Sequence, residues 1–421
     1  MPQSQTHDLP TTERPMRVLF CNWRDTRNPE GGGSEVYVEN VATALAIAGH
    51  DVTILCAAHD NAPADEVVDG VRFVRRGSKL GVYPHVFLRQ LLRRLGRFDV
   101  VVDVQNGIPF GSTLTGRTPV VVLVHHVHRE QWPVVYGPVR AKIGWALESQ
   151  VAPWLYRRSH YVAVSQATRN ELVELGVDAS RIDVVHNGVE RPVRDAEPAA
   201  HPRILVLGRL VPHKRVEHVL AAAAELRSDH PDLRVSVVGD GWWAPELVAE
   251  AERLGVTDLV EFVGFADEET KHLELSRAWV LALPSLKEGW GLVVMEAAGY
   301  AVPSVGYSAA GGVAESVVDG VTGLLADDPA SFTDALRRLL DDSALRLRLG
   351  GAAAARTWEF GWDTAARSFA GVLARATGLG DAPAVLDPEP AHVHLEHPHD
   401  DELPDDALRG TEATTNEVAT P

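Results

Sequence analysis

The sequence predicts an α/β protein made of two doubly wound domains that face a cleft. Short apolar runs alternate with helical segments along most of the 421 residues, an order typical of parallel sheets covered by helices. The alternation starts again after Glu190–Pro202, a stretch with three prolines and several charges that we interpret as an interdomain linker. Two domains also suit the length, because single cores rarely grow beyond about 250–300 residues.

Composition and charge exclude several classes of protein. The chain is 45% hydrophobic and 23% charged, as ordinary globular proteins are. No apolar run approaches the roughly 20 residues that span a bilayer, and the first 15 residues lack the apolar core of a signal peptide. We therefore expect a cytoplasmic protein. The net charge of −18 argues against nucleic-acid binding. Cys21 and Cys56 each end an apolar run and are expected to be buried, reduced thiols.

The first half opens with a strand–helix–strand unit. Met16–Phe20 and Val52–Cys56 are apolar runs, and Ser34–Ala48 between them has helical spacing. The Gly31–Gly33 loop falls between strand and helix, where open α/β sheets bind ligands. Three glycines could equally relax a turn. Further strands are expected at Val100–Val104, Pro119–Val124, Tyr161–Ser165 and Ile182–His186.

Residues 70–98 hold eight Arg/Lys and no Asp or Glu. Within them, Val86–Phe98 has the spacing of an amphipathic helix that places Arg89, Arg93 and Arg94 mostly opposite its leucines. A basic amphipathic helix is a candidate for contact with an anionic membrane surface. The alternative is a helix that packs on the sheet with its arginines in water.

Three histidines, His125, His126 and His128, follow the strand at Pro119–Val124. The carboxyl end of a parallel strand lies at the ligand edge of a sheet. This spacing suggests zinc, but no Cys or acidic cluster nearby completes a ligand set. We favour hydrogen bonding to a polar substrate.

The second half repeats the strand–helix order. Strands are expected at Arg203–Leu207, Val235–Val238, Val260–Val263, Val280–Leu283 and Val302–Val305, and helices at Val216–Leu226, Ala244–Leu254 and near 267–278, 291–299 and 331–340. Arg209 and Lys214 bracket the first strand–helix junction, where an anion would bind.

Leu281–Glu296 carries the clearest chemical pattern. It reads from a buried strand through a glycine-containing loop into a helix that begins near Gly291, and unpaired N–H groups at a helix start bind anions. Glu288 lies in the loop and Glu296 inside the helix, where each can reach a ligand whose phosphates sit at the helix start. The alternative is a buried strand followed by an amphipathic helix with two surface glutamates.

The frame S-x-x-E-G-x-G-L-x-x-x-E-A resembles the E-x7-E pattern of retaining glycosyltransferases of family 4, and the resemblance covers about residues 16–375. It also includes Gly32-Gly33-Ser34-Glu35, His125, the run G-R-L-V-P-H-K at 208–214, Gly239-Asp240-Gly241, Gly311-Gly312 and Asp319–Gly323. The chain departs from the family at Arg215, where many members have Gly, and at Trp290, which replaces a common Phe. The resemblance implies the GT-B fold, two Rossmann-like doubly wound domains facing a cleft.

The resemblance also implies roles for single residues. His125 would contact the donor sugar, Arg209 and Lys214 the diphosphate, Glu288 the sugar, and Glu296 the ribose hydroxyls. The implied catalytic residues are His125, Glu288, Arg209 and Lys214, and the implied donor-binding residues are Gly32, Gly33, Arg209, Lys214, Val263, Gly264, Phe265, Glu288, Gly291, Leu292 and Glu296.

The resemblance implies a retaining transfer of a hexose from a nucleotide diphosphate sugar, GDP-mannose or a UDP-hexose, to a lipid or glycan acceptor. No cofactor or metal is implied, and neither half contains an Asp-x-Asp metal motif. The basic segment with Arg89, Arg93 and Arg94 suggests peripheral contact with the inner face of a membrane. Two alternatives stay open: a non-catalytic nucleotide-sugar-binding regulator, and a sugar-nucleotide epimerase or phosphorylase on the same scaffold.

The expected organisation is a disordered N-terminus at 1–15, an acceptor-side Rossmann-like domain at 16–190, a linker at 191–202, a nucleotide-sugar-binding Rossmann-like domain at 203–357, a helix at 358–375 that crosses back to the first domain, and a disordered acidic tail at 378–421. The tail is rich in Pro, Ala and Asp/Glu and has little to bury. Its histidines at 392, 394, 397 and 399 could bind metal, but a solvated tail is the preferred interpretation.

Overall fold

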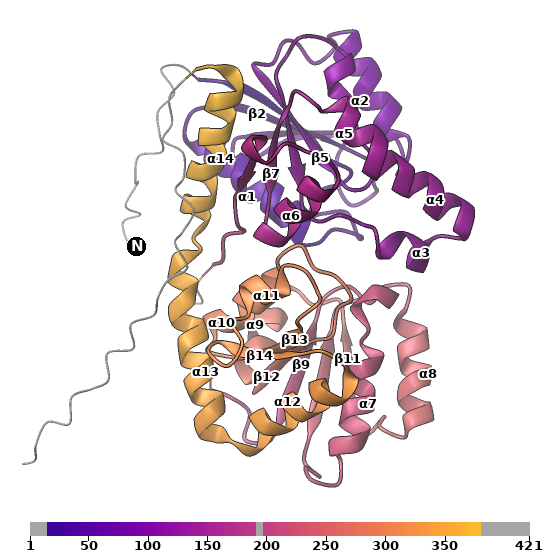
Figure 1. The fold of residues 1–421 in the computed structure, drawn as a ribbon, viewed down its shortest axis with the longest axis vertical. Helices are drawn as coiled ribbons and strands as arrows, with labels where there is room; N and C mark the ends of the chain where they lie inside the picture. Colours follow the sequence, from indigo (N-terminus) through magenta and orange to yellow (C-terminus); the bar gives the residue numbers. More distant parts are fainter. Residues whose placement is uncertain (1–14, 191–196, 380–421) are drawn as a thin grey trace, which may run out of the picture. The chain divides into compact units, whose positions relative to one another are not determined.

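The computed structural model describes residues 15–190 and 197–379, and within them the strands of the two halves form two sheets (Figure 1). Predictions for residues 1–14, 191–196 and 380–421, which include the histidine-containing tail, lie outside the described residues. The predicted fold class is confirmed, because parallel strands joined by helices make up both sheets.

The first sheet has the order β3-β4-β2-β1-β5-β6-β7-β8. Its strands are β1 Arg17–Cys21, β2 Asp51–Cys56, β3 Asp65–Val68, β4 Val71–Arg75, β5 Val100–Gln105, β6 Val120–Val124, β7 His160–Ala163 and β8 Ile182–Val184. Neighbouring strands are parallel except for the β3–β4 hairpin at one edge. The carboxyl ends of the parallel strands therefore share one edge, at which the loops after β1, β2, β4 and β6 gather.

Helices cover both faces of this sheet. They are α1 Gly33–Ile47, α2 Val82–Leu91, α3 Gln131–Val135, α4 Pro138–Ala146, α5 Ala152–Leu155 and α6 Gln166–Glu174, together with α14 Trp362–Thr377 from the other end of the chain. Alternate residues of β1 serve the two faces: Val18 and Phe20 join a core with α1 and α14, whereas Leu19 and Cys21 join a core with α2, α5 and α6.

The basic helix is predicted wrongly in its second half. The structure has α2 at Val82–Leu91 rather than at 86–98, and the chain turns at Arg93, whose φ is +51°. Arg89 lies on the helix, whereas Arg93 and Arg94 lie in the turn after it. Leu91 and Leu92, directly before this turn, are exposed, whereas Leu95 after it is partly buried against the core that includes Val82 and Val86.

The second sheet has the order β11-β10-β9-β12-β13-β14 and is parallel throughout. Its strands are β9 Arg203–Leu207, β10 Arg234–Val238, β11 Val260–Gly264, β12 Val280–Leu283, β13 Ser304–Tyr307 and β14 Gly323–Ala326, and its helices are α7 Glu217–Leu226, α8 Ala244–Leu254, α9 Glu268–Arg277, α10 Leu292–Gly299, α11 Val313–Ser316, α12 Pro329–Asp341 and α13 Ser343–Arg356. One hydrophobic core, drawn from residues 204–349, holds this half together.

The last helix, α14, packs on the first sheet although it follows the second half in sequence (Figure 1). Phe369 is fully buried, and its ring stacks on that of Phe20 with the centroids 5.9 Å apart. The helix begins four residues later than the predicted Trp358, because Thr357–Glu359 form a separate 3₁₀ turn. Gly378, with a φ of +66°, ends it.

Candidate active site

The helix start at the centre of the sequence pattern is built as expected. Gly291 lies at the N-cap of α10 with a φ of +87°, a left-handed conformation that glycine adopts without strain. A Cβ at this position would also lie 3.3 Å from Cγ2 of Val294. Trp290 before it is 2% exposed and packs edge-on against Phe360, so the departure from the family's Phe fills a core position. The N–H of Val294 donates to the oxygen of Gly291 at 2.9 Å, so the N–H groups at the very start of the helix, those of Leu292 and Val293, are left for a ligand.

Glu288 and Lys214 meet in front of this helix start. Oε1 of Glu288 accepts hydrogen bonds from Nζ of Lys214 at 2.5 Å and from Oγ of Ser285 at 2.6 Å. Burial alone would raise the pKa of Glu288, but Lys214 and Ser285 outweigh it and the pKa is lowered. The carboxylate is therefore ionised at neutral pH and acts as a hydrogen-bond acceptor.

Arg209 reaches from the second half to the first. Its Nη1 donates to the main-chain oxygen of Glu30 at 3.3 Å, and a Cβ on Gly32 would lie 3.5 Å from its Nε. Burial, followed by the charge of Arg24, lowers the pKa of Arg209 against the opposing effect of nearby glutamates. The guanidinium remains a cation, since an arginine side chain stays protonated throughout the physiological pH range.

Gly32 and Gly33 bring a second helix start to the same place. The N–H of Gly32 donates to Oε2 of Glu35 at 2.8 Å, which closes the first turn of α1. A Cβ on Gly33 would lie 3.5 Å from Cδ2 of Leu292, the first residue of α10. Two helix N-termini, one from each half, therefore approach each other, and both favour negative charge.

His125, directly after β6, is 5% exposed and lies edge-on to Tyr37 with the centroids 5.4 Å apart. Burial, together with the charge of His128, lowers the pKa of His125 to about 3, so the ring is neutral at physiological pH. Its Nε2 has no hydrogen-bond partner within residues 15–190 and 197–379. A Cβ on Gly289 would lie 2.2 Å from the oxygen of His125, so only glycine lets the loop beside Glu288 pass this close.

The remaining predicted residues lie further along the second sheet. Glu296, in α10, pairs with Lys271 of α9 at 3.1 Å. Val263 and Gly264 end β11, where the oxygen of Gly264 accepts from the N–H of Gly239 at 2.8 Å. Phe265 is 82% exposed, so its side chain is open to a ligand or to solvent.

Comparison with known proteins places this arrangement in a family. A model described as Glycosyltransferase Family 4 matches residues 31–192, and one described as Glycosyl transferases group 1 matches residues 192–356. A glycogen synthase of Mycobacterium tuberculosis is 31% identical over 399 residues, which cover 86% of this chain and 95% of that protein. This chain belongs to glycosyltransferase family 4.

Another relative in sequence and two solved structures are also similar to this chain. A D-inositol 3-phosphate glycosyltransferase of Streptomyces avermitilis is 31% identical over 396 residues, 82% of this chain and 84% of its own length. Sucrose-phosphate synthase from Thermosynechococcus elongatus has a TM-score of 0.75 at 20% identity, covering 87% of this chain and all of that one. HepE from Anabaena, solved in complex with UDP-glucose, has a TM-score of 0.67 at 19% identity, with 86% of this chain and 100% of that one covered. The fold is GT-B, and the protein is a glycosyltransferase.

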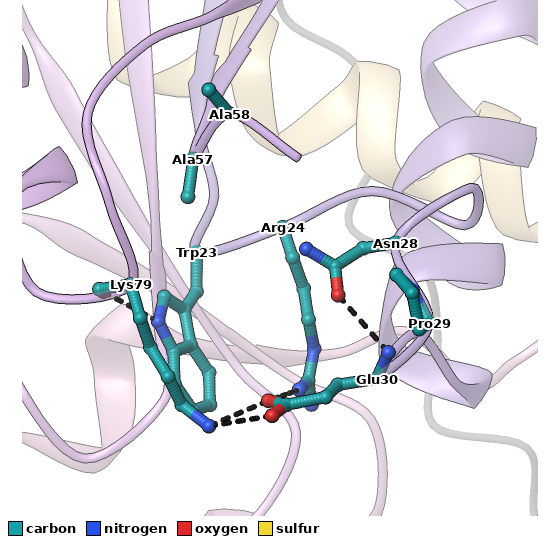
Figure 2. A pocket seen from close by; sticks show the side chains of 8 residues that line it. All are labelled: Trp23, Arg24, Asn28, Pro29, Glu30, Ala57, Ala58 and Lys79. Atoms are coloured by element: carbon teal, nitrogen blue, oxygen red, sulfur yellow. Dashed lines mark hydrogen bonds and ion pairs between the residues drawn. The ribbon is translucent and has the colours of Figure 1, made fainter. Parts of the chain in front are cut away.

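The structure has a pocket in the first half that none of the family 4 motifs identifies (Figure 2). It has a volume of 280 Å³ and is lined by Trp23, Arg24, Asn28, Pro29, Glu30, Ala57, Ala58 and Lys79. These residues follow β1, β2 and β4, three strands whose carboxyl ends share one edge. The one signal in the sequence is the polar run Trp23-Arg24-Asp25 directly after the first strand.

Asp25 anchors the loop that forms this pocket. Its carboxylate accepts from Nε of Arg75 at 2.5 Å and lies 2.8 Å from Nε2 of His59. Both Asp25 and Arg75 are 1% exposed, so the pair is fully buried and holds the end of β1 to β4. Removing either partner would leave an uncompensated buried charge.

The histidines do not form a metal site with acidic neighbours. His126 contacts Gln131 at 2.9 Å and His128 contacts Glu148 at 2.8 Å, so both are engaged within the protein. Over the described part of the chain, no three His, Cys, Asp or Glu side chains are arranged to hold a metal ion. No motif in the sequence singles out His213, which precedes Lys214. Burial, followed by the charge of Lys214, lowers the pKa of His213 to about 4.

Proposed function

We propose that this family 4 enzyme transfers a hexose from GDP-mannose or a UDP-hexose to a lipid or glycan acceptor, with retention of configuration. The observation that carries the proposal is the convergence of Arg209, Lys214 and the starts of α1 and α10 on one place. Two cations and two helix N-termini suit a diphosphate. HepE, whose structure holds UDP-glucose, supports a nucleotide-sugar donor.

The chemistry follows from charge that develops on the leaving group. As the bond from sugar C1 to the diphosphate stretches, the diphosphate oxygens become more negative. Arg209, Lys214 and the N–H groups of Gly291 and Leu292 would stabilise that charge, an effect that is strong in a site from which water is excluded. In the structure Lys214 is paired with Glu288. A bound diphosphate would therefore share or replace Glu288 as the partner of Lys214.

Glu288 and His125 would position the sugar. An ionised Glu288 accepts hydrogen bonds from sugar hydroxyls, and it is not proposed as a nucleophile. The neutral ring of His125 leaves Nε2 without a protein partner in the described residues, which makes this nitrogen available to a donor hydroxyl. Glu296 would hold the ribose, and the main chain of Val263–Phe265 would bind the base. No metal or cofactor is proposed.

Location at a membrane is a separate part of the proposal. None of the described helices is both long and apolar enough to cross a bilayer. The end of α2 and the turn after it combine exposed Leu88, Leu91 and Leu92 with basic Arg89 and Arg93. Apolar and basic side chains together favour peripheral binding to anionic lipids. We propose that the enzyme works in the cytoplasm and contacts the inner face of the membrane through Arg89, Arg93 and Arg94.

Donor binding tests the central proposal. Calorimetry and thermal shift would compare UDP, GDP, ADP and their common sugar conjugates on the full chain. One diphosphate should bind selectively, and Lys214→Ala should lose this binding while Lys142→Ala, a change on α4, keeps it. A protein that binds none of these compounds, or a Lys214→Ala variant that binds normally, would contradict the proposed donor site.

A further inference from the structure

A carboxylate of the second half closes the start of a helix in the first half. At the start of α6, the side chain of Ser165 serves as the N-cap and accepts from the N–H of Thr168 at 3.0 Å. The first N–H groups of a helix have no partner inside it. In α6, those of Gln166 and Ala167 donate to the two carboxylate oxygens of Glu315 on α11, at 2.8 and 2.5 Å. The cap of α6 is therefore complete only while the two halves are together.

The charge of Glu315 suits this contact. Burial alone would raise its pKa, but the ring of His186 and the N–H groups of α6 outweigh burial, and the pKa is lowered. Nε2 of His186 lies 3.6 Å from Oε2 of Glu315. The carboxylate is therefore ionised at neutral pH, and a negative charge at a helix N-terminus is stabilising. An uncharged side chain at this position would lose that attraction.

The short helix α11 is joined in turn to the loop that carries Glu288. The N–H of Glu288 donates to the oxygen of Ala310 at 3.0 Å, and the N–H of Gly312, directly before α11, donates to the oxygen of Glu288 at 3.1 Å. A Cβ on Gly312 would lie 2.1 Å from the oxygen of Gly289, which leaves no room for a side chain. Glu315 follows Gly312 within one helical turn. The main chain at Glu315 is therefore fixed to that of Glu288.

The start of α6 is likewise joined to the loop that carries His125. Oγ1 of Thr168 donates to the main-chain oxygen of His125 at 3.1 Å, and Oγ of Ser165 donates to Oγ1 of Thr168 at 2.9 Å. Ser165 and Thr168 are at most 1% exposed, so these hydrogen bonds lie in the interior. Glu315 thus links α6 and His125 of the first half to α11 and Glu288 of the second half.

We propose that Glu315 is a positioning residue of the transferase: by holding the start of α6, it sets where His125 lies relative to Glu288. This inference rests on the proposed function, in which these two residues contact the donor sugar from opposite halves. A displacement of about 1 Å at a reacting group can cost a hundredfold in rate, so the separation of the two residues has to be fixed.

The diphosphate of the donor is proposed to bind at a different place, around Arg209 and Lys214. The two halves also meet there, through the hydrogen bond from Arg209 to the main-chain oxygen of Glu30, and Glu315 takes no part in that bond. Loss of the Glu315 carboxylate should therefore weaken the contacts of the sugar and leave those of the diphosphate.

Calorimetric titration of the full chain with UDP, GDP, UDP-glucose, UDP-galactose and GDP-mannose would separate the two contributions. In the unchanged protein, a sugar conjugate should bind more tightly than its diphosphate alone. In Glu315→Ala, affinity for this conjugate should fall about tenfold, the equivalent of one lost hydrogen bond, while affinity for the diphosphate stays within about twofold. Glu315→Gln, whose amide oxygen can still accept from an N–H of α6, should lie between Glu315→Ala and the unchanged protein.

Hydrogen exchange would report the contact itself. The amides of Gln166 and Ala167 should exchange faster in Glu315→Ala, because they lose their acceptor. Amides of β2 and β10 should exchange as in the unchanged protein, which would show that the variant is folded. Glu250→Ala, which removes a carboxylate that pairs with Arg253 on α8, is the matched control and should alter neither exchange at α6 nor binding.

The positioning role is ruled out if Glu315→Ala keeps full affinity for the sugar conjugate, or loses affinity for the diphosphate to the same extent. It is also ruled out if the amides of Gln166 and Ala167 exchange no faster, or if no conjugate binds more tightly than its diphosphate. A protein that binds none of the five compounds contradicts the proposed donor function, and the positioning role with it. Normal donor binding with an unaffected Glu315→Ala variant contradicts the positioning role alone.

Discussion

Lys214 and Glu288 are each other's partner when the site holds no ligand, and both are largely buried. If a phosphate group of the donor replaces Glu288 as the partner of Lys214, little free energy is lost, because one charge-assisted hydrogen bond replaces another. The ion pair also holds both side chains in place beside the position where the diphosphate is proposed to bind. Preorganisation of this kind lowers the cost of ordering on binding.

Substitution of either member of the pair should abolish transfer without unfolding the protein. For Lys214→Ala and Glu288→Ala we expect a loss of about 100- to 1,000-fold in kcat/KM, the effect of removing one group that stabilises a transition state. Activity with the donor found by binding would be measured beside circular dichroism. Near-normal activity in either variant would show that the donor site is elsewhere.

His125 should make the protein sensitive to mild acid. An unfolded histidine has a pKa of about 6.5, and that of His125 is lowered to about 3 by burial and by His128. Below pH 6.5 the unfolded chain takes up a proton that the folded protein does not, so the free energy of unfolding falls as the pH falls from 6.5 toward 3. Above pH 6.5 His125 is neutral in both the folded and the unfolded protein, so it no longer makes the free energy of unfolding depend on pH.

The expected size is about 2 kcal/mol between pH 7 and pH 5 for one such histidine. Urea unfolding at both pH values would compare the unchanged protein with His125→Gln, which should lose about that much less stability on acidification. His160→Gln, a change at a half-buried histidine, is the control and should show a smaller effect. An equal acid sensitivity in His125→Gln and in the unchanged protein would contradict the neutral, buried state of His125.

At the scale of the element, strands of the second sheet are predicted well, and β9, β10 and β12 inside the sheet are largely buried on both faces. β12 matches its predicted range, and β9, β10 and β11 differ from theirs by at most one residue. Such strands are continuous apolar runs, which need no knowledge of their neighbours. The elements that the sequence does not predict are the strands β3, β4 and β14 and the helices α3, α4, α5, α6, α11 and α13. β3, with the sequence DEVV, lies at the sheet edge and is mostly exposed, so its sequence carries no burial pattern.

The proposed donor site and the pocket lined by Trp23, Arg24 and Lys79 differ in how far the sequence could predict them. Glu288, Gly291 and Glu296 lie within one local strand–loop–helix unit, and their spacing alone indicates an anion site. Arg24 and Lys79 are far apart in sequence and meet because β1 and β4 end at the same sheet edge. Their proximity depends on the order of the strands in the sheet, which cannot be predicted from a short stretch of sequence.

The segment that ends α2 gives a prediction at this scale. Replacing Arg89, Arg93 and Arg94 by Ser should weaken binding to vesicles of phosphatidylglycerol about a hundredfold, since each basic residue near an anionic surface contributes about 1 kcal/mol. Sedimentation with anionic and with neutral vesicles would measure it, and the neutral vesicles serve as the control. Unchanged sedimentation of the triple variant would remove the proposed membrane contact.

At the scale of the whole molecule, the two halves touch through fixed polar contacts as well as through the proposed donor site. The carboxylate of Glu315, on α11, accepts from the N–H groups of Gln166 and Ala167 at the start of α6, at 2.8 and 2.5 Å. Lys287 forms an ion pair with Glu171 on the same helix. The start of α6 is thus capped by the other half, a contact that would be broken if the halves moved apart.

The crossing helix α14 gives a prediction at this scale. Phe369→Ala should cost about 3–5 kcal/mol, the usual cost of deleting a buried phenyl ring. Hydrogen exchange should then rise first in β1 and β5 and not in the second sheet. Phe332→Ala, which removes an equally buried ring from the second core, is the matched control and should loosen α12 and β13. Faster exchange in the second sheet of Phe369→Ala would contradict the assignment of α14 to the first core.

The place of α14 also sets the order in which a newly made chain can finish folding. The second core draws on residues 204–349 and can close as soon as they have left the ribosome. The first sheet leaves earlier, yet the face that it shares with α1 is covered only in part until Phe369 and its neighbours have been made. At about 5–20 residues per second that delay is on the order of ten seconds or more. The interval in which a chaperone can bind the first domain is therefore set by the length of the second.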